Sequence, residues 1–236
     1  MDVYYLMINM GSVLGSLLLC YFYWQESRSL KKTLGVYLIS LAASEFGSFF
    51  GKLVRGLSYG KGESLWELLT GEGGTHFLGR VIFVLLFFPA AYRLAYRAGS
   101  REWIPYLDSL CIFLTFQHIF NRMACLFRGC CMGGFYRGPF AWKYPWGSGT
   151  GAGYGYPVYP TQLFEMLCMI FLLFVLLFLR KKRKRLLFVF GSCFSAVIFL
   201  SEFMMEKTGT IRVMGCSVIQ YAAVLLMGVL GIYAAA

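Results

Sequence analysis

The sequence predicts an all-α polytopic membrane protein with about seven transmembrane helices. Of its 236 residues, 58% are apolar and only 14% are charged, whereas soluble domains have about 25% charged residues. The mean hydropathy is +0.64. Its apolar residues form long runs such as Leu163 to Leu179, in which only Glu165 is charged, and runs of this length are typical of helices that cross a bilayer. We expect one transmembrane domain over residues 1–236.

Seven segments are long and apolar enough to cross the hydrocarbon core, which takes about 20 helical residues. Each is expected to be helical, because backbone polar groups cannot stay unpaired in lipid. The second and fourth are the least apolar, since they contain Glu45 and Asp108. The expected spans are Val3 to Trp24, Thr33 to Leu53, Thr75 to Tyr96, Ile104 to Phe120, Thr161 to Leu179, Leu186 to Met205 and Met214 to Ala234.

Basic residues set the expected orientation. The links after the first, third and fifth spans are basic, with Arg28, then Arg97 and Arg101, then the run Arg180 to Arg185. Cytoplasmic loops carry an excess of Lys and Arg, so the N-terminus is expected outside and the C-terminus in the cytoplasm. These anchors near anionic lipid also account for the net charge of +11, so no nucleic-acid partner is predicted. The first span has no charged stretch before it, so we expect it to be retained and not removed as a signal peptide.

The eight cysteines do not predict a metal site. Most lie one per span, where a free Cys behaves as a small apolar residue. Only Cys125, Cys130 and Cys131 cluster, and their spacing is not that of a paired C-x-x-C zinc site. Neither a metal nor another cofactor is predicted.

Ionisable side chains within the spans are the main indication of function, because each costs a few kcal/mol to bury in lipid. His118 and Arg122 are four residues apart, so they share one face at the external end of the fourth span. A guanidinium there could hold a lipid phosphate. An imidazole beside it could accept a proton from a thiol or hydroxyl, although a hydrogen-bonded packing histidine is an equally open interpretation.

A second polar group lies where the fifth span begins. The segment Tyr159 to Glu165 has the composition of a helix start, with Thr161 as a candidate cap. Gln162 and Glu165 are three residues apart and form a polar corner on an otherwise apolar helix. Capping explains Thr161 but not a carboxylate deeper in the span. Glu202, near the outer end of the sixth span, could bring a second carboxylate to the same level.

A long external loop is expected at about residues 121–160, between the fourth and fifth spans. Loops of this length in a compact domain are usually functional or disordered. The many aromatic residues in this segment argue against disorder and favour packing at the level of the lipid headgroups.

Two motifs resemble those of the bacterial prolipoprotein diacylglyceryl transferase family. The first, from Asn121 to Gly133, is similar to the family signature, in which an Arg precedes an Asn or Cys and two glycines. The second, from Tyr159 to Glu165, is similar to the family's His-Pro-Ser/Thr-Gln-Leu-Tyr-Glu element, with Tyr in place of His and Phe in place of Tyr. Weaker similarity, including the segment Phe199 to Glu202, extends over most of the chain from about residue 40.

The resemblance implies a seven-helix enzyme of the bacterial plasma membrane. Such an enzyme moves the diacylglyceryl group of phosphatidylglycerol to a Cys thiol in the lipobox of a lipoprotein precursor and releases glycerol phosphate. Arg122 would hold the phosphate, and Gly129 and Gly133 would let the backbone approach the headgroup. The expected catalytic residues are His118, Glu165 and Glu202, and the expected substrate-binding residues are Arg122, Cys125, Gly129, Cys130, Gly133 and Gln162.

The chain also departs from the family pattern. Leu78 stands where the family has a His before a Gly, and Ile198 stands where it has an Arg. Cys125 and Cys130 replace an Asn and an acidic residue. Either His118 has taken over proton removal, or the chemistry or acceptor differs, or the chain keeps the fold and a headgroup pocket and binds an anionic phospholipid without catalysis.

Overall fold

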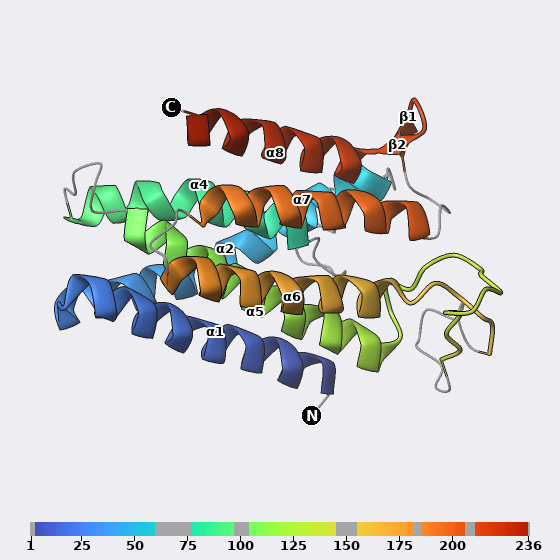
Figure 1. The fold of residues 1–236 in the computed structure, drawn as a ribbon, viewed down its shortest axis with the longest axis horizontal. Coiled ribbons are helices and arrows are strands. Elements are labelled where there is room, and N and C mark those ends of the chain that lie inside the picture. The colour runs from blue at the N-terminus through green and yellow to red at the C-terminus, as the bar shows by residue number, and fades with distance from the viewer. Residues whose placement is uncertain are drawn as a thin grey trace.

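The computed structural model describes residues 3–59, 77–96, 104–144, 155–181, 186–205 and 211–235. Its helices run lengthwise along the molecule and are inclined to one another (Figure 1). The charged links at residues 60–76, 97–103 and 182–185, on which much of the orientation prediction depends, lie outside the described residues. The helices are α1 (Val3–Ser27), α2 (Leu30–Tyr59), α4 (Phe77–Tyr96), α5 (Ile104–Arg128), α6 (Thr161–Lys181), α7 (Leu187–Met204) and α8 (Val218–Ala235).

Six of the described helices are long and apolar enough to cross a membrane, namely α1, α2, α4, α5, α6 and α7. The seventh, α8, is also apolar and has 18 residues, Val218–Ala235. The all-helical, multi-pass class is therefore confirmed. The total of seven crossings and the orientation of the termini remain predictions.

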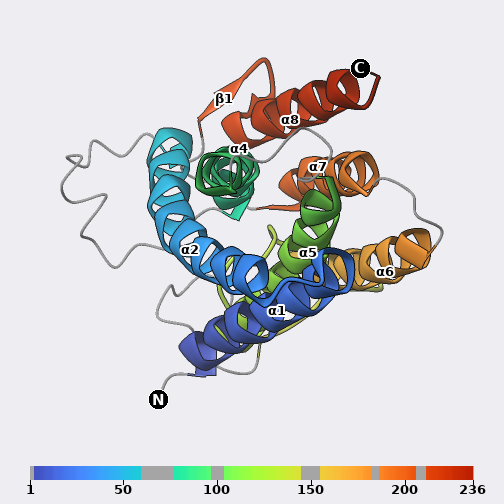
Figure 2. The same ribbon diagram turned by 90° about the vertical axis from the view of Figure 1, so that its left-hand side faces the viewer.

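Helix α5 lies at the centre of the bundle (Figure 2). It packs along α1 on one side and along α6 on the other, while α2 packs on α4 and α7 packs on α8. Its apolar span is 67% buried, compared with 22% for α1. Polar side chains on α5 are therefore shielded from the surroundings far more than those on the outer helices.

Several boundaries differ from the sequence prediction. Helix α5 continues to Arg128, because the residues after Phe120 keep an apolar, helix-compatible pattern, and it ends where Gly129 adopts a φ of 66°. The expected start of the last span at Met214 is wrong. Met214 lies in the turn of a hairpin formed by β1 (Arg212–Val213) and β2 (Cys216–Ser217), and α8 begins only after it.

The segment after α5 therefore begins at residue 129, about eight residues later than predicted. Its described parts fold back on each other, since Trp142 and Val158 exchange backbone hydrogen bonds, both of 3.0 Å. Gly134 donates to the carbonyl of Met204 at the end of α7, at 2.8 Å. Residues 145–154 lie outside the described residues. The described parts of this loop are thus hydrogen-bonded to the start of α6, through Thr161, and to the end of α7, through Met204.

Candidate functional site

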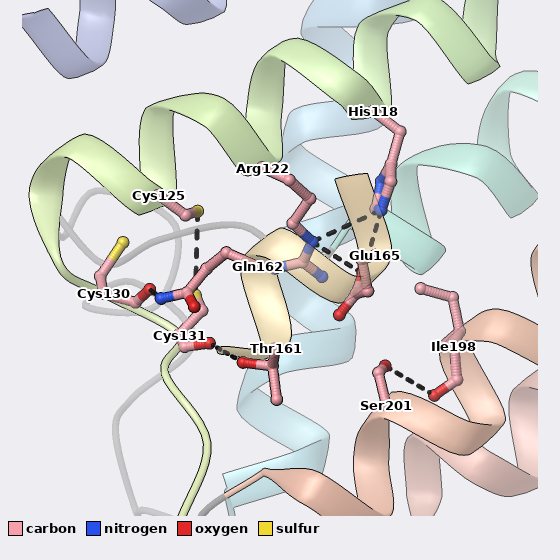
Figure 3. Close-up of polar contacts among 10 residues, drawn as sticks. All are labelled: His118, Arg122, Cys125, Cys130, Cys131, Thr161, Gln162, Glu165, Ile198 and Ser201. Carbon is pink, nitrogen blue, oxygen red and sulfur yellow. Dashed lines mark hydrogen bonds and ion pairs between the residues drawn. The ribbon is translucent and has the colours of Figure 1, made fainter. Parts of the chain in front are cut away.

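Three buried polar side chains meet between α5 and α6 (Figure 3). The Arg122 Nε donates to Glu165 Oε2 at 2.7 Å, and His118 Nε2 lies 3.0 Å from the same oxygen. The side chains of His118 and Glu165 are fully buried, and that of Arg122 is 10% exposed. A buried ion pair of this kind is weak evidence for stability, since desolvation offsets much of the attraction. It is better evidence for function.

The Arg122 guanidinium has one edge held and one edge open. Its Nε is the only one of its nitrogens that makes a hydrogen bond with the described residues, to Glu165, while His118 Nε2 lies 3.4 Å from the same Nε. The two Nη atoms are the edge that can form a bidentate contact with a phosphate or carboxylate. Glu165 thus fixes the orientation of the guanidinium and leaves its anion-binding edge available.

The hydrogen-bond pattern also assigns the histidine tautomer. Because the shorter contact with Glu165 takes the Arg122 Nε proton, His118 Nε2 is best assigned as a second donor to the carboxylate. Its Nδ1 then carries a lone pair and has no hydrogen bond to the described residues. The ring packs between Phe77, at 4.5 Å between centroids, and Phe194, at 5.5 Å. The shared helix face of His118 and Arg122 is confirmed.

Two residues of the first turn of α6 hold the loop that follows α5. The Thr161 hydroxyl donates to the carbonyl of Cys131 at 2.7 Å, and its role as a helix cap stays a prediction. The Gln162 amide nitrogen donates to the carbonyl of Cys130, and its oxygen accepts from the Tyr144 hydroxyl at 2.7 Å. Since Gln162 is fully buried, these contacts assign it a positioning role; its contact with substrate stays a prediction.

The side chains of Cys125, Cys130 and Cys131 converge at this loop, with all three sulfur atoms within 4.8 Å of one another. The hydrogen bond with Cys125 lowers the pKa of the Cys130 thiol, but the contact with Cys131 and burial outweigh it and raise that pKa to about 12. Burial likewise raises the pKa of Tyr144 to about 12, against the effect of its hydrogen bond to Gln162. Both groups are therefore protonated near neutral pH.

The two glycines of the first motif have clear structural reasons. Gly129 adopts the left-handed conformation that ends α5. A Cβ at Gly133 would lie 2.4 Å from the Cβ of Tyr159 and 2.6 Å from the Met204 carbonyl oxygen. The resemblance implied that these glycines admit a headgroup, but their described neighbours are protein atoms. Their contact with lipid stays a prediction.

Glu202 lies in a separate polar group and does not join the His118 and Arg122 contacts. Its Oε2 accepts from the Ser217 hydroxyl at 2.8 Å, and Gln220 Oε1 accepts from the Ser217 backbone N–H at 2.9 Å. It interacts electrostatically with Glu165, Arg122 and Arg212 of β1. The predicted arrangement of two acids around the arginine is therefore formed directly by one acid only.

The sequence prediction missed Tyr144, Ser217 and Arg212. No motif marks them, because each is brought to the site by a loop or hairpin. Two of the four departures from the family pattern are apolar and buried here, since Leu78 and Ile198 have 0% and 2% exposure. At these two positions the described structure therefore holds packing residues, with neither a base nor a cation.

Comparison with known proteins places the whole chain in one family. No curated protein matches it. The model of the prolipoprotein diacylglyceryl transferase family matches residues 1–236, and this match spans both motifs and all the helices of the bundle. The chain is thus a multi-pass membrane protein that belongs to the prolipoprotein diacylglyceryl transferase family.

Proposed function

We propose that this protein transfers the diacylglyceryl group of phosphatidylglycerol to the thiol of a lipobox cysteine in a lipoprotein precursor. Family membership indicates a transferase of this kind. The observation that carries the donor assignment is Arg122, a buried guanidinium whose Nε edge is held by Glu165 while its Nη edge makes no hydrogen bond to the described residues. A phosphodiester headgroup supplies the paired oxygens that such an edge binds.

The reaction forms one bond and breaks another. The acceptor sulfur bonds to the glycerol carbon next to the phosphate, and the bond from that carbon to the phosphate oxygen breaks. The electron pair leaves with glycerol phosphate, whose developing charge Arg122 stabilises. The thiol proton goes to a base, for which we propose His118 Nδ1 because it is unprotonated in the assigned tautomer.

The proposed setting is the bacterial plasma membrane, with the Arg122 end of the bundle at the outer leaflet. This orientation rests on the basic links predicted to be cytoplasmic. We further propose that Glu202, Cys125 of α5 and the loop residues Cys130 and Gly133 line the path of the substrates, since this loop covers the end of the bundle where Arg122 lies.

Mass spectrometry of an acceptor peptide tests the proposal. Purified protein in phosphatidylglycerol nanodiscs is incubated with a lipobox peptide, and the gain of one diacylglyceryl group is measured. Arg122→Ala is expected to lower the rate of transfer by a factor of about 10² or more, because it removes charge stabilisation of the leaving phosphate. Arg137→Ala is the matched control, since Arg137 is exposed on the same loop and contacts the ring of Phe135.

A second candidate function is binding of an anionic phospholipid without transfer. The apolar residues Leu78 and Ile198, at positions where the family pattern has a base and a cation, favour this alternative. Wild-type protein that retains phosphatidylglycerol through purification but never modifies the peptide would support it and overturn the transferase proposal.

A further inference from the structure

The three cysteines at the end of α5 form a preorganised group whose thiols take no chemical step in the proposed transferase reaction. Their sulfur atoms all lie within 4.8 Å of one another, and the Sγ atoms of Cys125 and Cys131 are 4.0 Å apart. The sequence did not predict this group to be a metal site because its spacing differs from paired C-x-x-C motifs. The fold brings the thiols together by reversing the chain at a glycine.

The backbone fixes the position of each thiol. The Cys130 N–H donates to the Cys125 carbonyl at 3.1 Å, which closes the end of the helix around Gly129. Cys131 has a φ of 56°, in the left-handed region that is unfavourable for a residue other than glycine. Hydrogen bonds from Thr161 to Cys131 and from Gln162 to Cys130 hold this conformation from α6.

The separations suit a metal ion better than a disulfide. A zinc ion with Zn–S bonds of about 2.3 Å in tetrahedral geometry places its sulfur ligands about 3.8 Å apart. The observed spacing reaches that value with shifts of about 1 Å or less. A disulfide needs its two sulfur atoms at about 2.05 Å from each other. The Cys125 and Cys131 sulfur atoms, 4.0 Å apart, would have to approach by about 2 Å to form one, and the third thiol would stay unbonded.

We propose that Cys125, Cys130 and Cys131 together bind one thiophilic divalent cation, zinc, in a site distinct from the Arg122 anion site. Soft thiolate ligands select such ions. Binding of the ion releases the thiol protons to the solvent, and three thiolates around a divalent ion leave one net negative charge. Arg122 interacts electrostatically with Cys125 and Cys131, and Arg128 does so with Cys130, so two cations are placed to compensate that charge.

The fourth coordination position is open in this arrangement. No further His, Cys or carboxylate from the part of the chain that the structure describes joins the group. Cys131 is exposed while Cys125 is buried, so the site opens to its surroundings on the Cys131 side. A water molecule would complete the tetrahedron.

Cobalt substitution tests the proposal without any measurement of transfer. Protein purified with reductant and stripped of metal is titrated with Co²⁺, whose tetrahedral thiolate complexes show a charge-transfer band in the near ultraviolet and d–d bands in the visible. We expect both sets of bands to saturate at one Co²⁺ per chain, and Zn²⁺ to abolish them. Cys131→Ser should weaken Co²⁺ binding by at least tenfold.

Cys193→Ser is the matched control, because Cys193 is exposed on α7 away from this loop, and it should bind Co²⁺ as the wild type does. Cys130→Ser provides a second test should Cys131→Ser fold poorly. Bands that are absent, or unchanged in both cluster variants, would overturn the site. So would a disulfide between Cys125 and Cys131 in protein whose thiols are alkylated in native membranes. Because no outcome depends on lipid transfer, failure of this site is distinguishable from failure of the transferase proposal.

Discussion

The two ends of α5 bury polar groups in opposite ways. Near its start, Tyr106 packs with Tyr23 and Tyr92, at 5.7 and 4.9 Å between ring centroids, and the hydroxyls of Tyr23 and Tyr92 share a hydrogen bond of 2.7 Å. Near its end, about 24 Å along the axis, Arg122 and Glu165 form a buried ion pair. The first end is dominated by packed aromatic rings, and its ion pair between Arg180 and Glu26 is partly exposed, with the Glu26 side chain 52% exposed. The second end has a buried ion pair at its centre, so we call the two the aromatic end and the charged end.

This difference indicates which end the protein keeps for stability and which for chemistry. Packed aromatic rings contribute apolar burial and about 0.5–1.5 kcal/mol per pair from their geometry. A buried ion pair often stabilises a protein no more than apolar residues of the same volume. We therefore expect substitutions at the charged end to affect transfer more than folding, and substitutions at the aromatic end to do the reverse.

The largest effect is expected for Glu165→Gln. The amide keeps the volume of the carboxylate but removes the charge that orients Arg122 and accepts from His118. The rate of transfer should fall by a factor of about 10²–10³, as measured by the mass gain of the lipobox peptide. Glu26→Gln is the control, since Glu26 is half-exposed and pairs with Arg180 at the opposite end of the bundle. Similar losses in the two variants would contradict the comparison.

A smaller loss of transfer is expected for His118→Gln. Removing a general base typically lowers the rate by a factor of 10² or more, and we expect the rate of transfer to fall by a factor of about 10² here. Retention of phosphatidylglycerol should be unchanged, since Arg122 remains. Retention is measured by mass spectrometry of the lipid that copurifies with the protein. An unchanged rate would show that His118 is only a packing residue between Phe77 and Phe194.

Gly133→Ala should act through the loop that covers the charged end. The new Cβ meets the Cβ of Tyr159 and the Met204 carbonyl within 2.6 Å, so the backbone must shift. We expect a destabilisation of about 1–3 kcal/mol, measured by thermal unfolding in detergent, and about a tenfold slower transfer. Gly228→Ala is the control, because nothing lies within 4 Å of its Cβ position. Equal unfolding temperatures for the two variants would argue against a tight loop contact.

The sequence predicted each part of the charged end but not the complete arrangement. Apolar runs predicted the helices, and helical periodicity predicted that His118 and Arg122 share one face. That Glu165 bonds to both of them depends on how α5 packs against α6, which no local pattern encodes. The same limit applies to Glu202, whose level in the bundle was predicted but whose partner Ser217 belongs to a different element.

The boundaries that failed have local physical causes. Helix α5 continues past Phe120 because Arg122 is tolerated within the helix when its guanidinium has a buried partner, Glu165. Met214 is apolar and was therefore assigned to the last span, yet it is 95% exposed at the tip of a hairpin with Gly215. Hydropathy alone does not distinguish an apolar turn residue from the first residue of a helix.

The smallest effect is expected for Tyr23→Phe at the aromatic end. The substitution keeps the ring packed against Tyr106 but removes the hydroxyl that is 2.7 Å from that of Tyr92. Because a buried hydrogen bond contributes about 0.5–1.5 kcal/mol, the unfolding temperature in detergent should fall slightly while the rate of transfer stays the same. Tyr21→Phe, whose ring is 54% exposed on the same helix, controls for the loss of any hydroxyl. A Tyr23→Phe variant that folds as stably as the wild type but transfers more slowly would break the division between the two ends, since it would link the aromatic end of α5 to the chemistry at Arg122.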